Sequence, residues 1–457
     1  MKIIIIILQA ILNLVRKRRD LIANRSKIPA NIKNAIKAIY DPKKQGMTNY
    51  DVIEAYVEDF TKFIKNGNGT FTQNKYNSSI TTQEWLLYKT NGKEIEAMDI
   101  YITADDNVSP ALRYYYYTSE NNDRKIFNLK VGLNHLPASC YKEKGSTIGI
   151  VFEAQPASEF NITITQLPTS ILKDLSGNGN HAYLYGGKGK LNSGMGLYKV
   201  DFTSWRKSSV QTEVKPDVVK VTPNTSDYLF IQYANSVEIP SYKIKVIGLG
   251  DNVLKYQYAT ENGRKEINIV EGENELPTSI KVSNDYQIGY RLTPGTSVFT
   301  ITQIPDYPDQ LCYDGKMYAV CYGFPILTDY TVMAERTWFE NRNVFLAKGN
   351  IATEAKYAFI FERFKPDGVM AVQSFGAWND VVSTTDSCIS YLTKNKYNGI
   401  DIRSGIGADD DMLSIGGALN KGNIELTSVC CHGAIIIADR SFTEEEINWL
   451  KDNWEKI

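Results

Sequence analysis

Histidine and cysteine are scarce in this sequence, and neither sign of charge is in excess. It has 3 His and 6 Cys among 457 residues, and its 51 basic and 52 acidic side chains leave a net charge of −1. A balanced charge gives no general attraction to a polyanion, so we expect no nucleic-acid partner. The cysteines show no CxxC pair and no Cys/His metal spacing. We therefore expect buried free thiols in a chain assembled in a reducing compartment, without a disulfide framework.

Common catalytic motifs are also missing. The sequence contains no GxSxG elbow, no phosphate-binding glycine pattern and no ExDxxE strand. A glycosidase needs two carboxylates roughly 5 to 10 Å apart, and no confident pair is apparent. We expect a non-enzymatic protein without a required cofactor, and we interpret His181 in GNGNH as a turn residue.

No apolar run is long enough to span a bilayer. The longest covers residues 3–15 and is followed at once by basic residues 16–19. As a helix it would span about 20 Å, short of the roughly 30 Å hydrocarbon core. We interpret residues 1–45 as an α-helical segment for docking or for dimer or trimer formation, and the alternatives are an uncleaved signal or anchor and an intrachain core helix. The expected contact positions are Ile4, Ile7, Leu8, Ile11, Leu12 and Val15.

Tyrosine, in contrast, is plentiful, with 29 residues. Its ring packs on half-buried strands and on wet recognition surfaces, because the hydroxyl can remain hydrated. The composition therefore favours a mainly β protein, in which the tyrosines either fill sheets or form a binding face. At roughly 150 residues per domain, the length suggests about three domains.

An internal repeat organises the middle of the chain. Residues 112–137 match residues 254–277, and ITITQLP at 162–168 matches FTITQIP at 299–305. Alternating tyrosines, β-branched runs and regularly spaced turn clusters predict the same small antiparallel β-sandwich twice. The first sandwich, with a linker, is placed in 46–170 and the second in 206–310. They are either spacers or carriers of Tyr-rich loops that contact a partner.

Two further segments suggest a third domain. The opening DLSGNGNHAYLYG (174–186) and the ending IADRSFTEEEINWL (437–450) resemble the first and last strands of concanavalin A-like, laminin G-type jelly rolls. The resemblance implies a jelly roll built from 171–205 and 311–457, with the second sandwich inserted and a helix at its C-terminus.

The combination of a YDPKKQGMTN segment (40–49), a DLSGNGNH segment and small sandwiches is similar to structural proteins of tailed phages of gut Bacteroidota, including the crAss-like group. The resemblance implies a virion protein, a head fibre or decoration protein or a tail fibre, assembled in the host cytoplasm. It implies contacts with capsid or tail proteins and adhesion to host-surface polysaccharide. The alternatives are a bacterial surface glycan-binding protein and a glycan hydrolase on the same jelly roll.

Two C-terminal segments supply candidate site residues. If 373–387 forms a loop at the sandwich rim, Trp378 would stack on a sugar ring, with Asn379 and Asp380 as polar partners. The alternative is that Trp378 is a core residue. The run Asp409, Asp410 and Asp411 could hold Ca²⁺ in a glycine-flanked loop, or could be a solvated turn.

Overall fold

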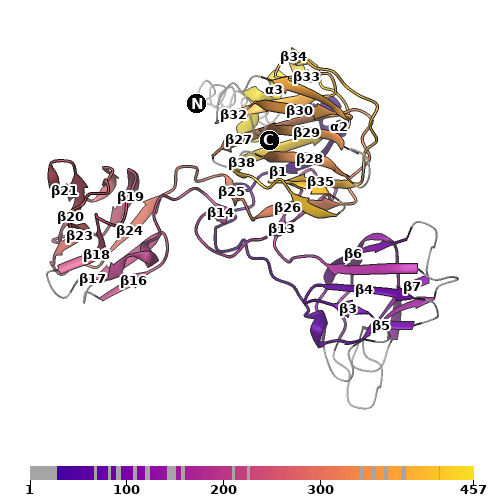
Figure 1. The fold of residues 1–457 in the computed structure, drawn as a ribbon, viewed down its shortest axis with the longest axis horizontal. Helices are drawn as coiled ribbons and strands as arrows, with labels where there is room; N and C mark the ends of the chain where they lie inside the picture. The colour runs from indigo at the N-terminus through magenta and orange to yellow at the C-terminus, as the bar shows by residue number, and fades with distance from the viewer. Residues whose placement is uncertain are drawn as a thin grey trace, which may run out of the picture.

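The structure, a computed structural model, is mainly β, which confirms the expected fold class. Two small sandwiches lie as separate lobes beside a larger two-sheet domain (Figure 1). The described residues are 28–65, 69–80, 84–88, 94–105, 111–118, 124–140, 151–155, 160–207, 211–223, 227–339, 343–351, 357–364, 369–381, 387–420 and 422–457.

The first lobe, sandwich 1, consists of two five-stranded antiparallel sheets. One sheet has the order β2 (Ile64–Lys65), β5 (Glu84–Tyr88), β10 (Val151–Gln155), β7 (Ala111–Tyr117), β8 (Arg124–Leu129). The other has the order β3 (Thr70–Phe71), β4 (Lys75–Ile80), β11 (Phe160–Gln166), β6 (Met98–Ala104), β9 (Gly132–Leu136).

The second lobe, sandwich 2, repeats this arrangement strand for strand. Its first sheet has the order β15 (Arg206–Lys207), β18 (Asp227–Tyr233), β23 (Gln287–Thr293), β20 (Val253–Thr260), β21 (Gly263–Ile269). Its second has the order β16 (Gln211–Val214), β17 (Val218–Thr222), β24 (Phe299–Ile304), β19 (Tyr242–Ile247), β22 (Gly272–Leu276). The predicted duplication of one fold is confirmed.

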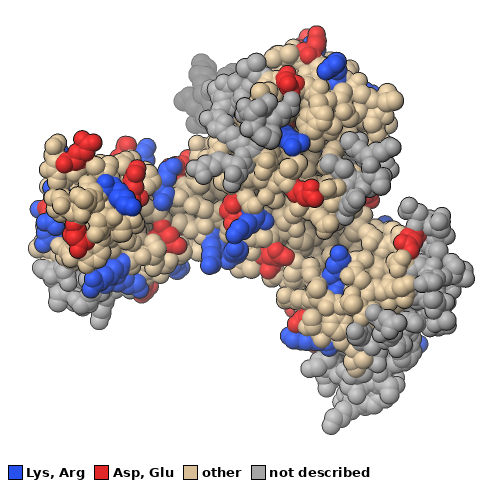
Figure 2. Space-filling model, viewed as in Figure 1, with Lys and Arg blue, Asp and Glu red and all other residues tan. Residues whose placement is uncertain are grey.

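Figure 2 shows acidic and basic side chains interspersed over the visible face of sandwich 2.

Matched residues explain the shared topology. Tyr114 and Tyr256 are fully buried in the two cores. Each stacks on the tyrosine two residues later, with ring centroids 5.8 Å apart in sandwich 1 and 6.2 Å apart in sandwich 2. Alternation along a strand places such pairs on one face of the sheet, so the same pattern specifies the same inward face twice.

The same turn also occurs in both sandwiches. In sandwich 1 the Asn134 side chain accepts from Lys130 N at 2.9 Å and donates to the Lys130 carbonyl at 2.7 Å. In sandwich 2 Asn274 bonds Val270 in the same way, at 2.9 and 2.8 Å. Gly132 and Gly272 adopt φ values of 96° and 92°, which glycine tolerates without a Cβ clash.

The larger domain, the jelly roll, consists of two sheets that enclose the main core. The first contains β14 (Gly194–Met195), β25 (Leu311–Asp314), β38 (Val429–Ala438), β27 (Thr331–Trp338), β32 (Ser387–Thr393), β33 (Lys396–Tyr397), β34 (Ile400–Asp401) and, beside β38, β1 (Ile36–Tyr40). The second contains β12 (Ile171–Leu172), β13 (Ala182–Tyr185), β26 (Tyr318–Tyr322), β35 (Met412–Ile415), β28 (Val344–Ile351), β29 (Tyr357–Phe364), β30 (Met370–Ser374), β31 (Ala377–Val381), β36 (Ala418–Asn420) and β37 (Asn423–Glu425). Strands β14 and β25 pair with each other, so the chain leaves the jelly roll and re-enters it at adjacent points around sandwich 2.

The prediction of a helix throughout residues 1–45 is wrong for its last part. Helix α2 (Ala30–Ala35) is followed directly by β1, which pairs with β38. Strand β25 covers only the first part of this edge of β38, and β1 covers the rest. A distant unpaired edge thus overrides local helical preference. The predicted contact positions Ile4, Ile7, Leu8, Ile11, Leu12 and Val15 lie outside the described residues.

The DLSGNGNH segment holds β1 in place. The Asp174 carboxylate accepts from Ile39 N at 3.0 Å, from Ser176 N at 2.8 Å and from Asn180 N at 3.0 Å. His181 Nδ1 accepts from Asp174 N at 3.0 Å. The motif that carries the family resemblance is therefore a structural turn, and His181 is part of it.

The C-terminal helix covers β1 from the outside. Helix α3 (Glu444–Asp452) begins with a capping box between Thr443 and Glu446. Its buried Ile447 and Leu450 share a cluster with Ile36 and Ile39. The two ends of the described chain thus pack together.

Candidate ligand-binding cleft

Sandwich 1 contacts the second sheet of the jelly roll through aromatic residues. Tyr183 on β13 donates to Asp99 Oδ2 on β6 at 2.7 Å, and the Tyr101 ring on β6 lies 4.5 Å from that of Tyr322 on β26. His135 on β9 contacts the other oxygen of Asp99 at 2.6 Å. Tyr183 and Leu167 are buried in this contact.

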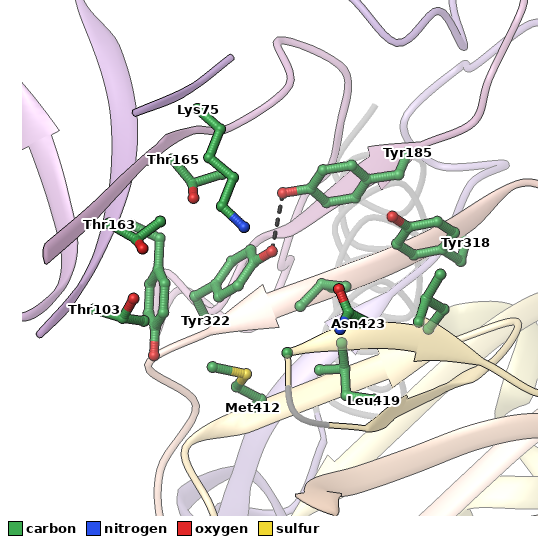
Figure 3. Close-up of a pocket in the computed structure, with 14 residues that line it drawn as sticks. Lys75, Thr103, Thr163, Thr165, Tyr185, Tyr318, Tyr322, Met412, Leu419 and Asn423 are labelled. Atoms are coloured by element: carbon green, nitrogen blue, oxygen red, sulfur yellow. Dashed lines mark hydrogen bonds between the residues drawn. The ribbon is translucent and has the colours of Figure 1, made fainter. Parts of the chain in front are cut away.

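A cleft of about 420 Å³ opens beside this contact (Figure 3). Sandwich 1 contributes one wall and the jelly roll contributes the other. We call it the tyrosine cleft. Its polar lining residues are Lys75, Thr103, Thr163 and Thr165, the four tyrosines Tyr101, Tyr185, Tyr318 and Tyr322, and Asn423; Met412, Leu419 and Ile424 add apolar surface.

Strand alternation places these side chains in the cleft. On β26, Tyr318 and Tyr322 face outward, while Ala319 and Cys321 between them point into the main core. On β11, Thr163 and Thr165 face outward and Ile164 points into the sandwich 1 core. The ITITQ and YAVCY segments therefore build both a core and a binding wall.

The cleft tyrosines form an ordered, uncharged group. The Tyr185 and Tyr318 rings stack with centroids 5.0 Å apart, and the Tyr185 and Tyr322 hydroxyls lie 2.9 Å apart. Burial raises the pKa of Tyr322 to about 12 and raises that of Tyr185 as well. Both hydroxyls are neutral at physiological pH and can donate or accept hydrogen bonds.

The residues predicted to bind sugar do not form the expected loop. Trp378, Asn379 and Asp380 lie on β31, the second strand of a hairpin. Asn379 bonds Arg403, accepting from its N–H at 2.8 Å and donating to its carbonyl at 2.8 Å. Trp378 is half-buried against an apolar cluster with the Arg363 guanidinium 5.5 Å from its ring centre. Since neighbours on a strand point to opposite faces, Asn379 cannot share a surface with the other two.

The aspartate run has its own cation. Lys348 Nζ lies 3.0 Å from the Asp409 carboxylate, and both side chains are almost completely buried. Asp409 also accepts from Leu327 N at 2.7 Å, while Asp410 accepts from Asp411 N at 2.6 Å. Asp409 is thus paired with Lys348, and the neighbouring carboxylates of Asp410 and Asp411 interact with each other. Among the described residues, no three His, Cys, Asp or Glu side chains converge as metal ligands.

The tyrosine cleft was not identified from the sequence, because its walls come from segments nearly 350 residues apart. The available signal was the spacing of tyrosines, two residues apart at 183 and 185 and four residues apart at 318 and 322, together with a strand that has threonine at alternate positions, 163 and 165. Those patterns predict strands that bury one face and expose the other, but they do not reveal which exposed faces contact each other.

Comparisons with known proteins do not assign a family. No protein-family model and no curated protein matches the chain. Among solved structures, a Trypanosoma rangeli sialidase in complex with the inhibitor DANA matches at 9% identity and a TM-score of 0.24, covering 83% of this chain and 82% of that one. Bacillus subtilis oxalate decarboxylase matches at 11% identity and a TM-score of 0.14, covering 56% of this chain and 78% of that one. TM-scores this low carry no argument about fold or function. None of the helices in the described ranges has the length and hydrophobicity that crossing a bilayer requires.

Proposed function

We propose that this chain is a non-enzymatic adhesion protein that binds glycan in the tyrosine cleft. The observation that carries the proposal is the cleft's composition, four tyrosines and three threonines around about 420 Å³. Sugar rings present apolar C–H faces to aromatic rings, while hydroxyl and amide groups satisfy their polar edges. The lining of the cleft offers both kinds of surface.

The carboxylates of the jelly roll support binding rather than hydrolysis. No carboxylate is among the described residues that line the cleft. In the main core, Glu362 accepts from Arg336 Nε at 2.5 Å, Trp338 Nε1 at 2.9 Å and Tyr397 Oη at 2.9 Å. A carboxylate bound on all sides in a closed core has a structural role, and it has no access to a substrate.

The virion part of the proposal rests on the sequence resemblance. A fibre or decoration protein would present several copies, so weak single sites would gain affinity through avidity. The modular build, with two copies of one sandwich beside a jelly roll, suits such a protein. Electron microscopy of phage particles labelled with an antibody against sandwich 2 tests this part and distinguishes a head position from a tail position. Unlabelled particles would contradict it.

Binding of the chain to a glycan array tests the adhesion proposal. The test compares wild type with Tyr318→Ala, which removes a cleft ring, and with Tyr228→Ala, which removes a half-buried tyrosine of sandwich 2. We expect Tyr318→Ala to weaken binding about tenfold or more and Tyr228→Ala to leave it unchanged. Thermal unfolding of each variant controls for folding. Absence of binding by wild type, or equal binding by both variants, would overturn the proposal.

A further inference from the structure

The charge of the tyrosine cleft is uneven. Among the described residues that line it, Lys75 on β4 is the only charged one. Figure 3 shows the Lys75 amino group directed toward the Tyr185 and Tyr322 hydroxyls. Within the described part of the chain, no carboxylate forms an ion pair with it. A lysine that faces a cleft without a partner leaves a positive charge for a ligand to meet.

Two carboxylates near the cleft, Glu54 and Asp99, have partners of their own. Glu54 accepts from Gly186 N at 2.6 Å and also bonds the Tyr56 hydroxyl. Asp99 is held by Tyr183 at 2.7 Å and by His135 at 2.6 Å. Neither carboxylate pairs with Lys75, so no described residue in the walls of the cleft neutralises the ammonium.

Negative charge acts on Tyr101, which lies across β11 from Lys75. The pKa of Tyr101 is raised chiefly by burial, and Asp411 and Asp410 add to the shift. These two carboxylates therefore act on the Tyr101 end. Because like charges repel, an anionic group is disfavoured there and favoured beside Lys75.

The fold itself does not require this lysine. The position of Lys75, opposite Thr165 in the register of β4 and β11, corresponds in sandwich 2 to Val218, opposite Thr302. The equivalent strand of sandwich 2, β17, forms with an apolar residue at this position. The sandwich topology therefore does not explain the lysine at this position.

From this arrangement, and resting on the proposed function, we propose that the cleft selects acidic glycans. The carboxylate or sulfate of one sugar lies beside Lys75 and accepts hydrogen bonds from the Tyr185 or Tyr322 hydroxyl. The ring of that sugar, or of the next one, stacks on a cleft tyrosine. The neutral part of the chain extends toward Tyr101.

The test is a glycan array that pairs uronic-acid, sialic-acid and sulfated oligosaccharides with their carboxyl-reduced or desulfated counterparts. The full-length chain is compared with Lys75→Gln and with Lys75→Arg, which keeps the charge. Because Lys75 is exposed, both variants are expected to unfold at the wild-type temperature. We expect wild type to bind the acidic member of a pair about tenfold or more tightly than its neutral counterpart. Lys75→Gln should abolish this preference and Lys75→Arg should retain it.

Salt supplies a second readout. Raising ionic strength from about 0.05 M to about 0.5 M should weaken acidic-glycan binding by wild type and leave residual binding by Lys75→Gln nearly constant. The carboxyl-reduced and desulfated arms show which anion is read. Equal binding of acidic and neutral members by wild type, or a preference unchanged in Lys75→Gln, would overturn the inference while leaving glycan binding intact. Binding of no glycan at all would overturn the proposed function itself.

Discussion

Sandwich 1 and sandwich 2 share an interior and differ on one outer face. In the matched registers, Tyr101 and Leu133 of sandwich 1 correspond to Lys245 and Glu273 of sandwich 2. The first pair packs against the jelly roll, and the second pair is exposed to solvent. The inward faces and turns therefore set the topology, while the outer face depends on what each copy meets.

The largest effects are expected in the shared interior. Tyr114→Ala and Tyr256→Ala each remove a fully buried ring, so each should lower the free energy of unfolding of its own sandwich by about 3 to 5 kcal/mol. Urea unfolding of the two variants measures the losses. If one sandwich tolerated the change and the other unfolded, the two interiors would not be equivalent.

A second prediction is that the stability of the jelly roll depends on pH in a way that the stability of the sandwiches does not. Complete burial lowers the pKa of His432 to about 4, while an unfolded histidine titrates near 6.5. Between these values the unfolded state binds the extra proton, so stability is full above about pH 6.5 and falls by about 3 kcal/mol as the pH drops through 4. His135, the histidine of sandwich 1, is exposed.

Urea midpoints of the jelly-roll transition at pH 7 and pH 4.5, in wild type and His432→Gln, check this prediction. The variant should show a shallower dependence on pH than wild type, whatever its absolute stability. An identical slope in both proteins would mean that another group controls acid unfolding.

The repeated turn should give a smaller and equal effect in the two sandwiches. Asn134→Ala and Asn274→Ala each remove the side chain that bonds the preceding turn, and each should cost about 1 to 2 kcal/mol. Asn128→Ala and Asn268→Ala, at matched exposed positions, are the controls and should change stability little. Thermal unfolding of the four variants measures the loss of stability. A different loss in each sandwich would show that the two turns do not contribute equally.

The smallest effect is expected on the free outer face. Lys245→Tyr places the residue of sandwich 1 at the matched exposed position of sandwich 2. Because no partner covers that face among the described residues, the unfolding free energy should change by less than about 0.5 kcal/mol. Chemical denaturation checks it, and a large loss would show that the outer face also takes part in folding.

The sequence predicted the parts of this fold that depend on local pattern. The repeat, with its alternating tyrosines and its Asn134 and Asn274 turns, fixed two sandwiches of one topology. Local pattern does not predict strand β1, because its partner β38 lies about 400 residues later. The segment around Trp378 is a hairpin and not the loop that the sugar site required, because the chain makes a tight turn at Gly376.

The site was harder to predict than the fold. Strand alternation shows that Tyr318 and Tyr322 share a face, but not that this face meets Thr163 and Thr165 of another domain. Local pattern does not predict the Lys348–Asp409 pair either, since Lys348 lies on β28 and Asp409 lies in the segment before β35. Contacts between domains require the tertiary arrangement, which local periodicity does not contain.

The most direct test of the account exchanges the outer faces. Glycan-array binding is measured for Tyr101→Lys with Leu133→Glu, which gives sandwich 1 the residues of sandwich 2, and for Lys245→Tyr with Glu273→Leu as the reciprocal control. If the tyrosine cleft is the binding site, the first double variant loses binding while both sandwiches still unfold cooperatively, and the control binds as wild type does. Full glycan binding by the first variant would contradict the account.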